Sequence, residues 1–173
     1  MPHELAPTRT ASRRLEATRL PEHTDRLYRA AYALSGSGPD AEDLVQETFA
    51  RVLSRPRFVR RGGERSYLMR VLHNTWIDFS RARAARPEPA AGEAVDWVVE
   101  PESDPGGLAL DVRLAYEGMR ELPAHQREAI AAVDVLGLSY KEAARSLRIR
   151  QGTLMSRLSR ARERVASYME GAA

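Results

Sequence analysis

Residues 137–164 constrain this 173-residue chain more than any other stretch, because two helical patterns follow one another there with a very short break between them. Ser139 is placed to cap the first helix, and Glu142 three residues later completes a capping box. The expected apolar face of this short helix consists of Tyr140, Ala143, Ala144 and Leu147. Residues 148–150 then separate it from a long arginine-rich helix. This order predicts a helix-turn-helix unit.

The long helix has an apolar seam on one side and a polar, arginine-bearing face on the other. The seam residues recur at steps of four and three and are Leu154, Leu158, Ala161, Val165 and Tyr168. At about 100° per residue, the side chains that point away from the seam are Thr153, Ser156, Ser159 and Arg160, with Arg157 and Arg164 on its flanks. Such a face suits the DNA major groove, because arginine can contact guanine through two hydrogen bonds or hold a phosphate. The alternative is that this basic face is merely exposed to solvent. The capped short helix and the tight turn that precede the long helix disfavour this alternative, because together they are typical of a DNA-binding unit.

Composition removes several other classes of function. The chain has no cysteine, and its four histidines (His3, His23, His73 and His125) lack metal-ligand spacing, so we expect neither a metal site nor a cofactor. No glycine-rich phosphate loop or paired catalytic motif stands out, so we expect no enzyme. No apolar run approaches the ~20 residues of a membrane span, and no signal peptide is seen, so we expect a cytoplasmic protein.

Charge is distributed in blocks. Residues 1–86 carry a surplus of six positive charges, residues 87–107 carry six acids and no base, and residues 108–173 carry a surplus of three positive charges. Two basic blocks therefore flank an acidic connector.

Two helices are expected before Pro56. The first covers residues 24–35, where apolar side chains share one face ahead of a break at residues 36–39. The second opens on Asp40 as its N-cap, with Ala41, Leu44, Val45, Phe49 and Val52 as its core face. The opposite face carries Asp43, Gln46, Glu47 and Ala50. Periodicity alone favours the interpretation that this polar face is exposed to solvent and binds no partner.

A basic loop precedes a third helix, which is expected over residues 64–83. The loop arginines are Arg55, Arg57, Arg60 and Arg61. One side of the helix carries a stripe of Tyr67, Arg70, Asn74 and Arg81. An aromatic ring, an amide and two guanidiniums in one stripe suit single-stranded nucleic acid, whose bases stack and whose backbone is negatively charged. The residues alone are equally consistent with a structural reading, in which Tyr67 belongs to the core and Asn74 is an ordinary surface amide.

These patterns predict an all-α chain with two small helical domains. Residues 1–20 form a mobile or loosely helical arm, and residues 21–86 form the first domain. Residues 87–107, with four prolines and three glycines, form an acidic flexible linker. Residues 108–173 form the second domain, in which Pro123 starts a helix and the helix-turn-helix follows.

Four segments together resemble a known family: residues 41–52 (AEDLVQETFARV), 67–81 (YLMRVLHNTWIDFSR), 121–130 (ELPAHQREAI) and 137–164. They resemble bacterial RNA polymerase sigma factors of the extracytoplasmic-function (ECF) group, in both domains and in the same order. The helix that contains DLVQE, followed by the C-terminal unit, is the most specific part. The resemblance implies a factor that binds core RNA polymerase and directs promoter-specific initiation, and that catalyses nothing itself.

The resemblance also implies roles by position. The surface that binds the β′ clamp of core polymerase would comprise Asp43, Leu44, Gln46 and Glu47. The residues that melt and read the −10 element would be Tyr67, Arg70, Asn74 and Arg81. The residues at the −35 element would be Arg148, Arg150, Thr153, Ser156, Arg157 and Arg160. Further implied partners are the polymerase β flap, promoter DNA and an anti-sigma factor, without membrane insertion.

Three positions depart from the family pattern. Arg148 stands where the turn usually has glycine, and Arg150 stands where a serine usually precedes the recognition helix. Met155 replaces a common lysine or arginine, which indicates an altered −35 preference or one phosphate contact fewer.

Two other classes of protein account for only part of the sequence pattern. A stand-alone helix-turn-helix regulator accounts for residues 137–164 but leaves the polar face of residues 43–47 and the stripe of residues 67–74 unexplained. A serine recombinase needs an α/β catalytic domain, and no segment of the N-terminal half is patterned as such.

Overall fold

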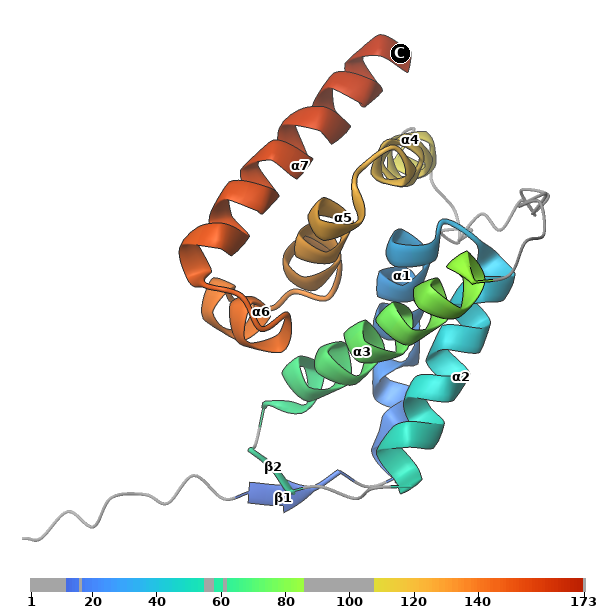
Figure 1. The fold of residues 1–173 in the computed structure, drawn as a ribbon, viewed down its shortest axis with the longest axis vertical. Coiled ribbons are helices and arrows are strands. Elements are labelled where there is room, and N and C mark those ends of the chain that lie inside the picture. The colour runs from blue at the N-terminus through green and yellow to red at the C-terminus, as the bar shows by residue number, and fades with distance from the viewer. Residues whose placement is uncertain (1–11, 16, 55–57, 61, 86–107, 173) are drawn as a thin grey trace, which may run out of the picture.

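The computed structural model describes residues 12–15, 17–54, 58–60, 62–85 and 108–172 (Figure 1). The elements of the N-terminal half are β1 (Ser12–Arg14), the 3₁₀ helix η1 (Ala17–His23), α1 (Thr24–Ser35), α2 (Gly38–Ser54), β2 (Phe58–Arg60) and α3 (Glu64–Ala84). Those of the C-terminal half are α4 (Leu108–Arg120), α5 (Ala124–Ile130), the π-helical turn η2 (Ala131–Val135), α6 (Tyr140–Ser146) and α7 (Gln151–Ala172). The all-α prediction is confirmed. The predicted linker, residues 87–107, and loop residues Arg55, Arg57 and Arg61 lie outside the described residues.

The first helix has the predicted bounds, whereas the second begins earlier than predicted. Gly36 ends α1 with a φ of 69°, a left-handed conformation that favours a residue without a Cβ. Asp40 was predicted as the N-cap of α2 and is not. Ser37 takes that role, because its hydroxyl accepts a hydrogen bond from the Asp40 backbone N–H at 3.4 Å. Asp40 instead pairs with Arg83 of α3 at 2.6 Å.

Part of the predicted N-terminal arm is folded onto the domain. β1 pairs antiparallel with β2, with Ser12 opposite Arg60. Leu15 and Leu20 are buried in the core. Residues 12–14 therefore form a strand where a mobile or loosely helical arm was expected, whereas residues 17–20 are helical as part of η1. The leucines of this segment gain apolar contact by folding back. Residues 1–11 lie outside the described residues.

In the C-terminal half, α7 packs across α4, α5 and α6 (Figure 1). A close approach of α4 and α7 depends on Gly118, since a Cβ there would lie 3.2 Å from the side chain of Tyr168. The seam predicted for α7 is confirmed at Leu154, Leu158, Ala161 and Val165, which are all buried. Tyr168 lies at the edge of the seam and is 37% exposed.

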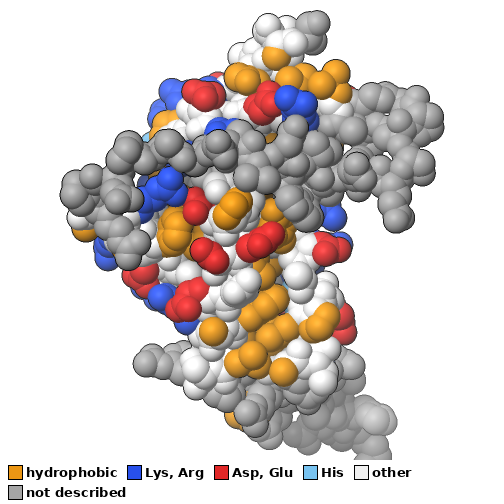
Figure 2. Space-filling model, turned by 90° about the vertical axis from the view of Figure 1, so that its right-hand side faces the viewer, with side chains coloured by type: hydrophobic (Ala, Val, Ile, Leu, Met, Phe, Trp, Pro, Cys, Tyr) orange, Lys and Arg blue, Asp and Glu red, His pale blue; other side chains and the backbone are white. Residues whose placement is uncertain are grey.

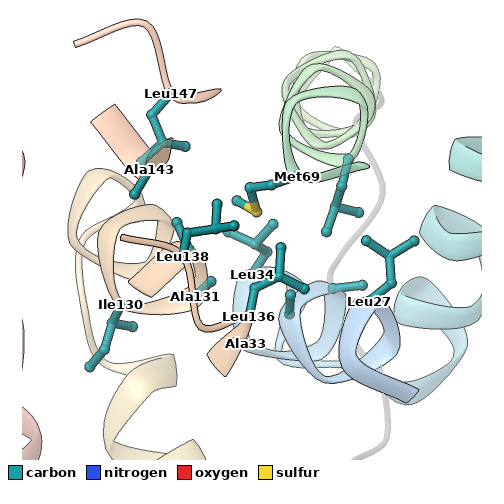
Figure 3. Packing of buried hydrophobic residues seen from close by; sticks show 14 of the residues in the cluster. Leu27, Ala33, Leu34, Met69, Ile130, Ala131, Leu136, Leu138, Ala143 and Leu147 are labelled. Atoms are coloured by element: carbon teal, nitrogen blue, oxygen red, sulfur yellow. The ribbon is translucent and has the colours of Figure 1, made fainter. Parts of the chain in front are cut away.

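The two halves pack against each other and share apolar core. In Figure 3, Met69 of α3 points toward Leu138 and Leu136 of the C-terminal half. Polar contacts cross the same boundary: the Ser146 hydroxyl donates to the Ser66 carbonyl at 2.9 Å, and His73 Nε2 lies 3.4 Å from a Glu128 carboxylate oxygen. The face of α3 that carries Ser66, Met69 and His73 is therefore occupied by the C-terminal half.

Among the helices described here, none is both long enough and apolar enough to cross a lipid bilayer.

Candidate nucleic-acid interface

The first helix of the predicted helix-turn-helix is α6, and its start is fixed by the capping box. The Glu142 backbone N–H donates to the Ser139 hydroxyl at 3.3 Å, and the Ser139 backbone N–H donates to the Glu142 carboxylate at 3.0 Å. The Ser139 hydroxyl also donates to the Glu142 carboxylate at 2.6 Å, and this bond first, then the one from the Ser139 backbone N–H, lowers the pKa of Glu142 below its usual range. Ala143, Ala144 and Leu147 are buried as predicted. Tyr140 was expected on the same face and is 39% exposed, because it lies at the first helical position, beside Arg162 of α7.

The turn keeps a left-handed residue even though an arginine occupies it. Arg148 has a φ of 56°, and its neighbour Ile149 donates its backbone N–H to the Ala144 carbonyl at 3.0 Å. A side chain with a Cβ adopts this conformation at a cost of roughly 1–2 kcal/mol. Arg150 then accepts a hydrogen bond from the Leu154 backbone N–H at 3.0 Å, which places it at the start of α7. The turn therefore directs two exposed arginines to the N-terminal end of the recognition helix.

The outward face of α7 carries the residues predicted to contact DNA. Thr153, Ser156 and Arg160 are exposed, and Arg157 is half-buried on the flank of the seam. The Ser156 hydroxyl donates to the Thr153 carbonyl at 3.0 Å and retains its capacity to accept.

The arginines on this face have no ion pair of their own. Within the described part of the chain, no carboxylate pairs with Arg148, Arg150, Arg157 or Arg160. Arg162, on the other flank of the helix, is paired with Asp134 at 2.6 Å. The face that points away from the core thus presents free guanidiniums, as binding to phosphate and base edges requires.

The second predicted nucleic-acid surface is the stripe on α3. Tyr67, Arg70 and Asn74 are half-buried and Arg81 is exposed. The Tyr67 ring packs against the core, so the core alternative applies in part to this residue. The Nε of Arg70 is buried and has no hydrogen-bond partner among the described residues. At 100° per residue, the stripe lies next to the face of α3 that the C-terminal half occupies.

The predicted polymerase-binding surface on α2 is smaller than expected. Asp43, Gln46 and Glu47 are exposed, but Leu44, which was predicted to belong to this surface, is 1% exposed and lies beneath it in the core. A helix with a period of 3.6 turns residue 44 away from the face shared by residues 43, 46 and 47. Figure 2, which views the side on which α2 lies, shows acidic side chains next to hydrophobic ones.

Glu47 is tied into a small network. Its carboxylate accepts from Arg51 Nε at 2.7 Å, and Arg51 Nη1 donates to Asp78 of α3 at 2.7 Å. Both pairs hold Arg51 charged, and the pKa of that guanidinium is raised, first by Glu47 and then by Asp78. Asp43 has no such ion pair within the described residues, which makes it the freer charge of the surface.

The three sets of residues do not form one site. The helices α2 and α7 lie on opposite sides of the molecule, with other helices between them (Figure 1). The helix α3, which carries the stripe, lies between them, because it contacts α2 on one side and α6 on the other. Such an arrangement suits a protein that contacts one long ligand at two places and a second partner elsewhere.

Sequence reasoning missed the residues that join elements far apart in the chain. Ser66 and Ser146 are 80 positions apart, and Asp134 and Arg162 are 28 apart. A serine or an exposed ion pair carries no periodic signal, so only the packed structure brings these partners together.

Comparison with known proteins matches both halves to models of one family. The model for Sigma-70 region 2 matches residues 21–86, and the model for Sigma-70 region 4 matches residues 113–165. The chain is 36% identical over 151 residues to the ECF RNA polymerase sigma factor SigE of Mycolicibacterium smegmatis, an alignment that covers 86% of this chain and 59% of SigE. It is 34% identical over 149 residues to the ECF RNA polymerase sigma factor EcfG of Rhodopseudomonas palustris, covering 82% of this chain and 79% of EcfG.

Two solved structures share the fold. The sigma factor RpoE from Bartonella quintana, in complex with the anti-sigma factor NepR, matches with a TM-score of 0.68 and 26% identity, covering 88% of this chain and 95% of RpoE. CnrH, in complex with the cytosolic domain of CnrY, matches with a TM-score of 0.60 at 21% identity, covering 90% of this chain and 88% of CnrH.

Proposed function

This chain belongs to the ECF group of RNA polymerase sigma factors, and from that premise we propose that it binds core RNA polymerase and directs initiation at promoters by reading their −35 and −10 elements. The observation that carries the proposal is the outward face of α7. It presents arginines without ion pairs among the described residues, above an apolar seam that fixes the helix in place.

We assign the −35 element to α7 and the turn before it. Ser156 and Arg160 lie near the middle of the exposed face, where side chains reach base edges in the major groove. Arg148 and Arg150 lie at the N-terminal end of the helix, where phosphate is nearer and the helix dipole favours an anion. Thr153 and Arg157 complete the set.

We assign the −10 element to the stripe on α3. Asn74 offers an amide to a base edge, and Arg70 and Arg81 supply positive charge for the DNA backbone. The half-buried Tyr67 gives the stripe an aromatic side chain beside the core, on which a base can stack. Single-stranded DNA is the fitting ligand, because stacking and amide readout both need a base taken out of the duplex.

We assign core polymerase to the exposed side chains Asp43, Gln46 and Glu47 of α2, facing the β′ clamp, and the β flap to the C-terminal half. A surface rich in carboxylates suits a partner with complementary charge, which steers association and fixes register. Catalysis belongs to the polymerase in this account, and the site of action is the cytoplasm.

We further infer that an anti-sigma factor binds this chain. The support is the similarity to RpoE of Bartonella quintana, which was solved with the anti-sigma factor NepR. The partner of the present chain would cover surfaces that polymerase needs.

One transcription assay tests the proposal. Purified chain is added to core polymerase on a pool of promoter fragments, and transcripts are compared with those of core polymerase alone. The proposal predicts discrete start sites that depend on the chain. A stand-alone regulator would bind DNA and leave core polymerase without specific initiation, and that result would overturn the proposal.

A further inference from the structure

A two-armed ion pair holds the recognition helix from the side. Arg162 of α7 donates through Nη2 to Asp134 Oδ1 at 2.6 Å and through Nε to Asp134 Oδ2 at 3.0 Å. The Tyr140 side chain at the start of α6 lies beside Arg162, so three elements meet at one guanidinium. These partners raise the pKa of Arg162, with Asp134 as the larger cause.

Asp134 reaches α7 from a π-helical turn. In η2 the Leu136 backbone N–H donates to the Ala131 carbonyl, five residues back, at 2.9 Å. A π-turn inserts one residue into a helix and shifts the direction of the side chains that follow, and such turns recur at functional sites. Here the shifted side chain forms the two-armed contact with α7.

The buried seam holds α7 in place chiefly through Leu154 and Leu158, which are large and almost fully buried. The seam residues on either side of Arg162 are the smaller Ala161 and Val165. At 100° per residue, Arg162 lies about 160° from Arg160, on the flank opposite Arg157. A two-armed bond on that flank adds a directional restraint on the rotation of the helix, and with it on the direction in which Arg160 and Ser156 point.

We propose that the Asp134–Arg162 pair is a positioning device for −35 recognition, which sets the rotation of α7 so that its outward side chains meet the correct base edges. The inference rests on the −35 role proposed above for α7. Both partners are partly exposed, with 49% and 31% of the Arg162 and Asp134 side chains accessible, so little of its effect should appear in stability.

The geometry explains why arginine stands at this position. A guanidinium forms two parallel hydrogen bonds with one carboxylate, whereas an ammonium acts as a single point charge. A lysine at residue 162 keeps the positive charge and loses the fixed angle.

The experiment transcribes a library with a randomised −35 element, using holoenzyme that carries each variant. We expect Arg162→Gln and Asp134→Asn each to reduce discrimination between the preferred base and the others by about fivefold, the lower end of what one two-armed base contact supplies. The two substitutions change net charge in opposite directions, so a shared loss cannot come from charge. The double variant should be no worse than either single one, because both remove the same bond.

Two further variants separate positioning from other roles. Arg162→Lys should recover only part of the discrimination, since it cannot form the two-armed bond. Arg113→Gln, which removes the pair with Glu117 at 3.0 Å on α4, should leave the sequence profile unchanged. Salt dependence of promoter binding should be the same for Arg162→Gln as for the unaltered chain.

Several results would overturn the inference. Arg162→Gln could weaken all sequences alike and make the salt slope shallower by about one, which would identify Arg162 as a phosphate contact. All variants could keep the original profile while the melting temperature falls, which would leave the pair a merely structural contact. If the unaltered holoenzyme selects no −35 sequence, the proposed −35 role and this inference both fail.

Discussion

Ser146 of α6 and Ser66 of α3 join the two halves of the chain: the Ser146 hydroxyl donates to the Ser66 carbonyl at 2.9 Å, and the two hydroxyl oxygens lie 3.1 Å apart. Ser146 is fully buried. The helix that carries the stripe proposed to read the −10 element is therefore bonded directly to α6, which supports the proposed −35 reader α7.

Replacing Ser146 with alanine should destabilise the chain. The substitution hardly changes the volume of the side chain, so the loss comes from the hydrogen bonds, and a lost buried partner costs about 1–3 kcal/mol. Urea denaturation measures the change in unfolding free energy. Ser167→Ala at an exposed position of α7 is the matched control. Equal stability of the two variants would show that the contact between Ser66 and Ser146 contributes nothing.

Asp43→Arg should weaken binding to core polymerase. Asp43 is preferred to Glu47, because reversing Glu47 would also break its pair with Arg51. An interface that meets a like charge loses both attraction and register. Pull-down of core polymerase in the absence of DNA measures the effect, and Asp25→Arg, at an exposed site in the first turn of α1, controls for net charge. Equal recovery of polymerase by both variants would place the docking surface elsewhere.

Asn74→Ala should spare the closed promoter complex and impair the open one. A captured base is worth about 1–3 kcal/mol, and the closed complex holds no unpaired base. Permanganate reactivity of thymines in the −10 region reports opening, and filter binding at low temperature reports the closed complex. Tyr67→Ala should act in the same direction and should also lower stability, because its ring packs against the core. Unchanged thymine reactivity in both variants would make them ordinary structural residues.

Arg148→Gly should raise stability and lower DNA affinity together. Glycine removes the strain of a left-handed φ, which stabilises the folded chain by roughly 1–2 kcal/mol. It also gives the unfolded chain more conformational entropy, which lowers the stability by roughly 0.5–1 kcal/mol. The net gain should be about 0.5–1 kcal/mol by thermal unfolding. Arg148→Ala is the matched control, because it loses the guanidinium and keeps the strain. A glycine variant no more stable than the alanine variant would show that the turn is unstrained.

Local patterns predicted the helices well. The bounds of α1, the capping box of Ser139 and Glu142 and most of the α7 seam follow from spacing and side-chain chemistry within a few turns. The N-cap of α2 was predicted wrongly, because two neighbouring residues could each cap this helix. Asp40 and Ser37 are both residue types that favour the N-cap; in the structure Ser37 caps the helix and Asp40 pairs with Arg83 of α3.

Contacts between distant elements could not be predicted. Leu44 was placed on the docking surface by resemblance, although its position on the helix buries it. Tyr140 seemed to belong to the core face of α6, and its contact with Arg162 depends on how α7 crosses that helix. The strand pair β1–β2 is short and lacks alternation, so no sequence pattern indicated it. Each of these features depends on contacts between elements that are distant in the sequence.

The proposed −35 role depends most directly on which arginines of the helix-turn-helix read bases and which hold phosphate. A library of promoters with a randomised −35 element is transcribed by holoenzyme that carries the unaltered chain, Arg160→Ala or Arg150→Ala, at several salt concentrations. Arg160→Ala should lose preference at one or two positions, corresponding to about 1–3 kcal/mol. Arg150→Ala should keep the sequence profile, weaken all promoters alike and make the salt slope shallower by about one. If Arg160→Ala keeps the original profile and only lowers the yield, the outward face of α7 does not read the −35 element as proposed.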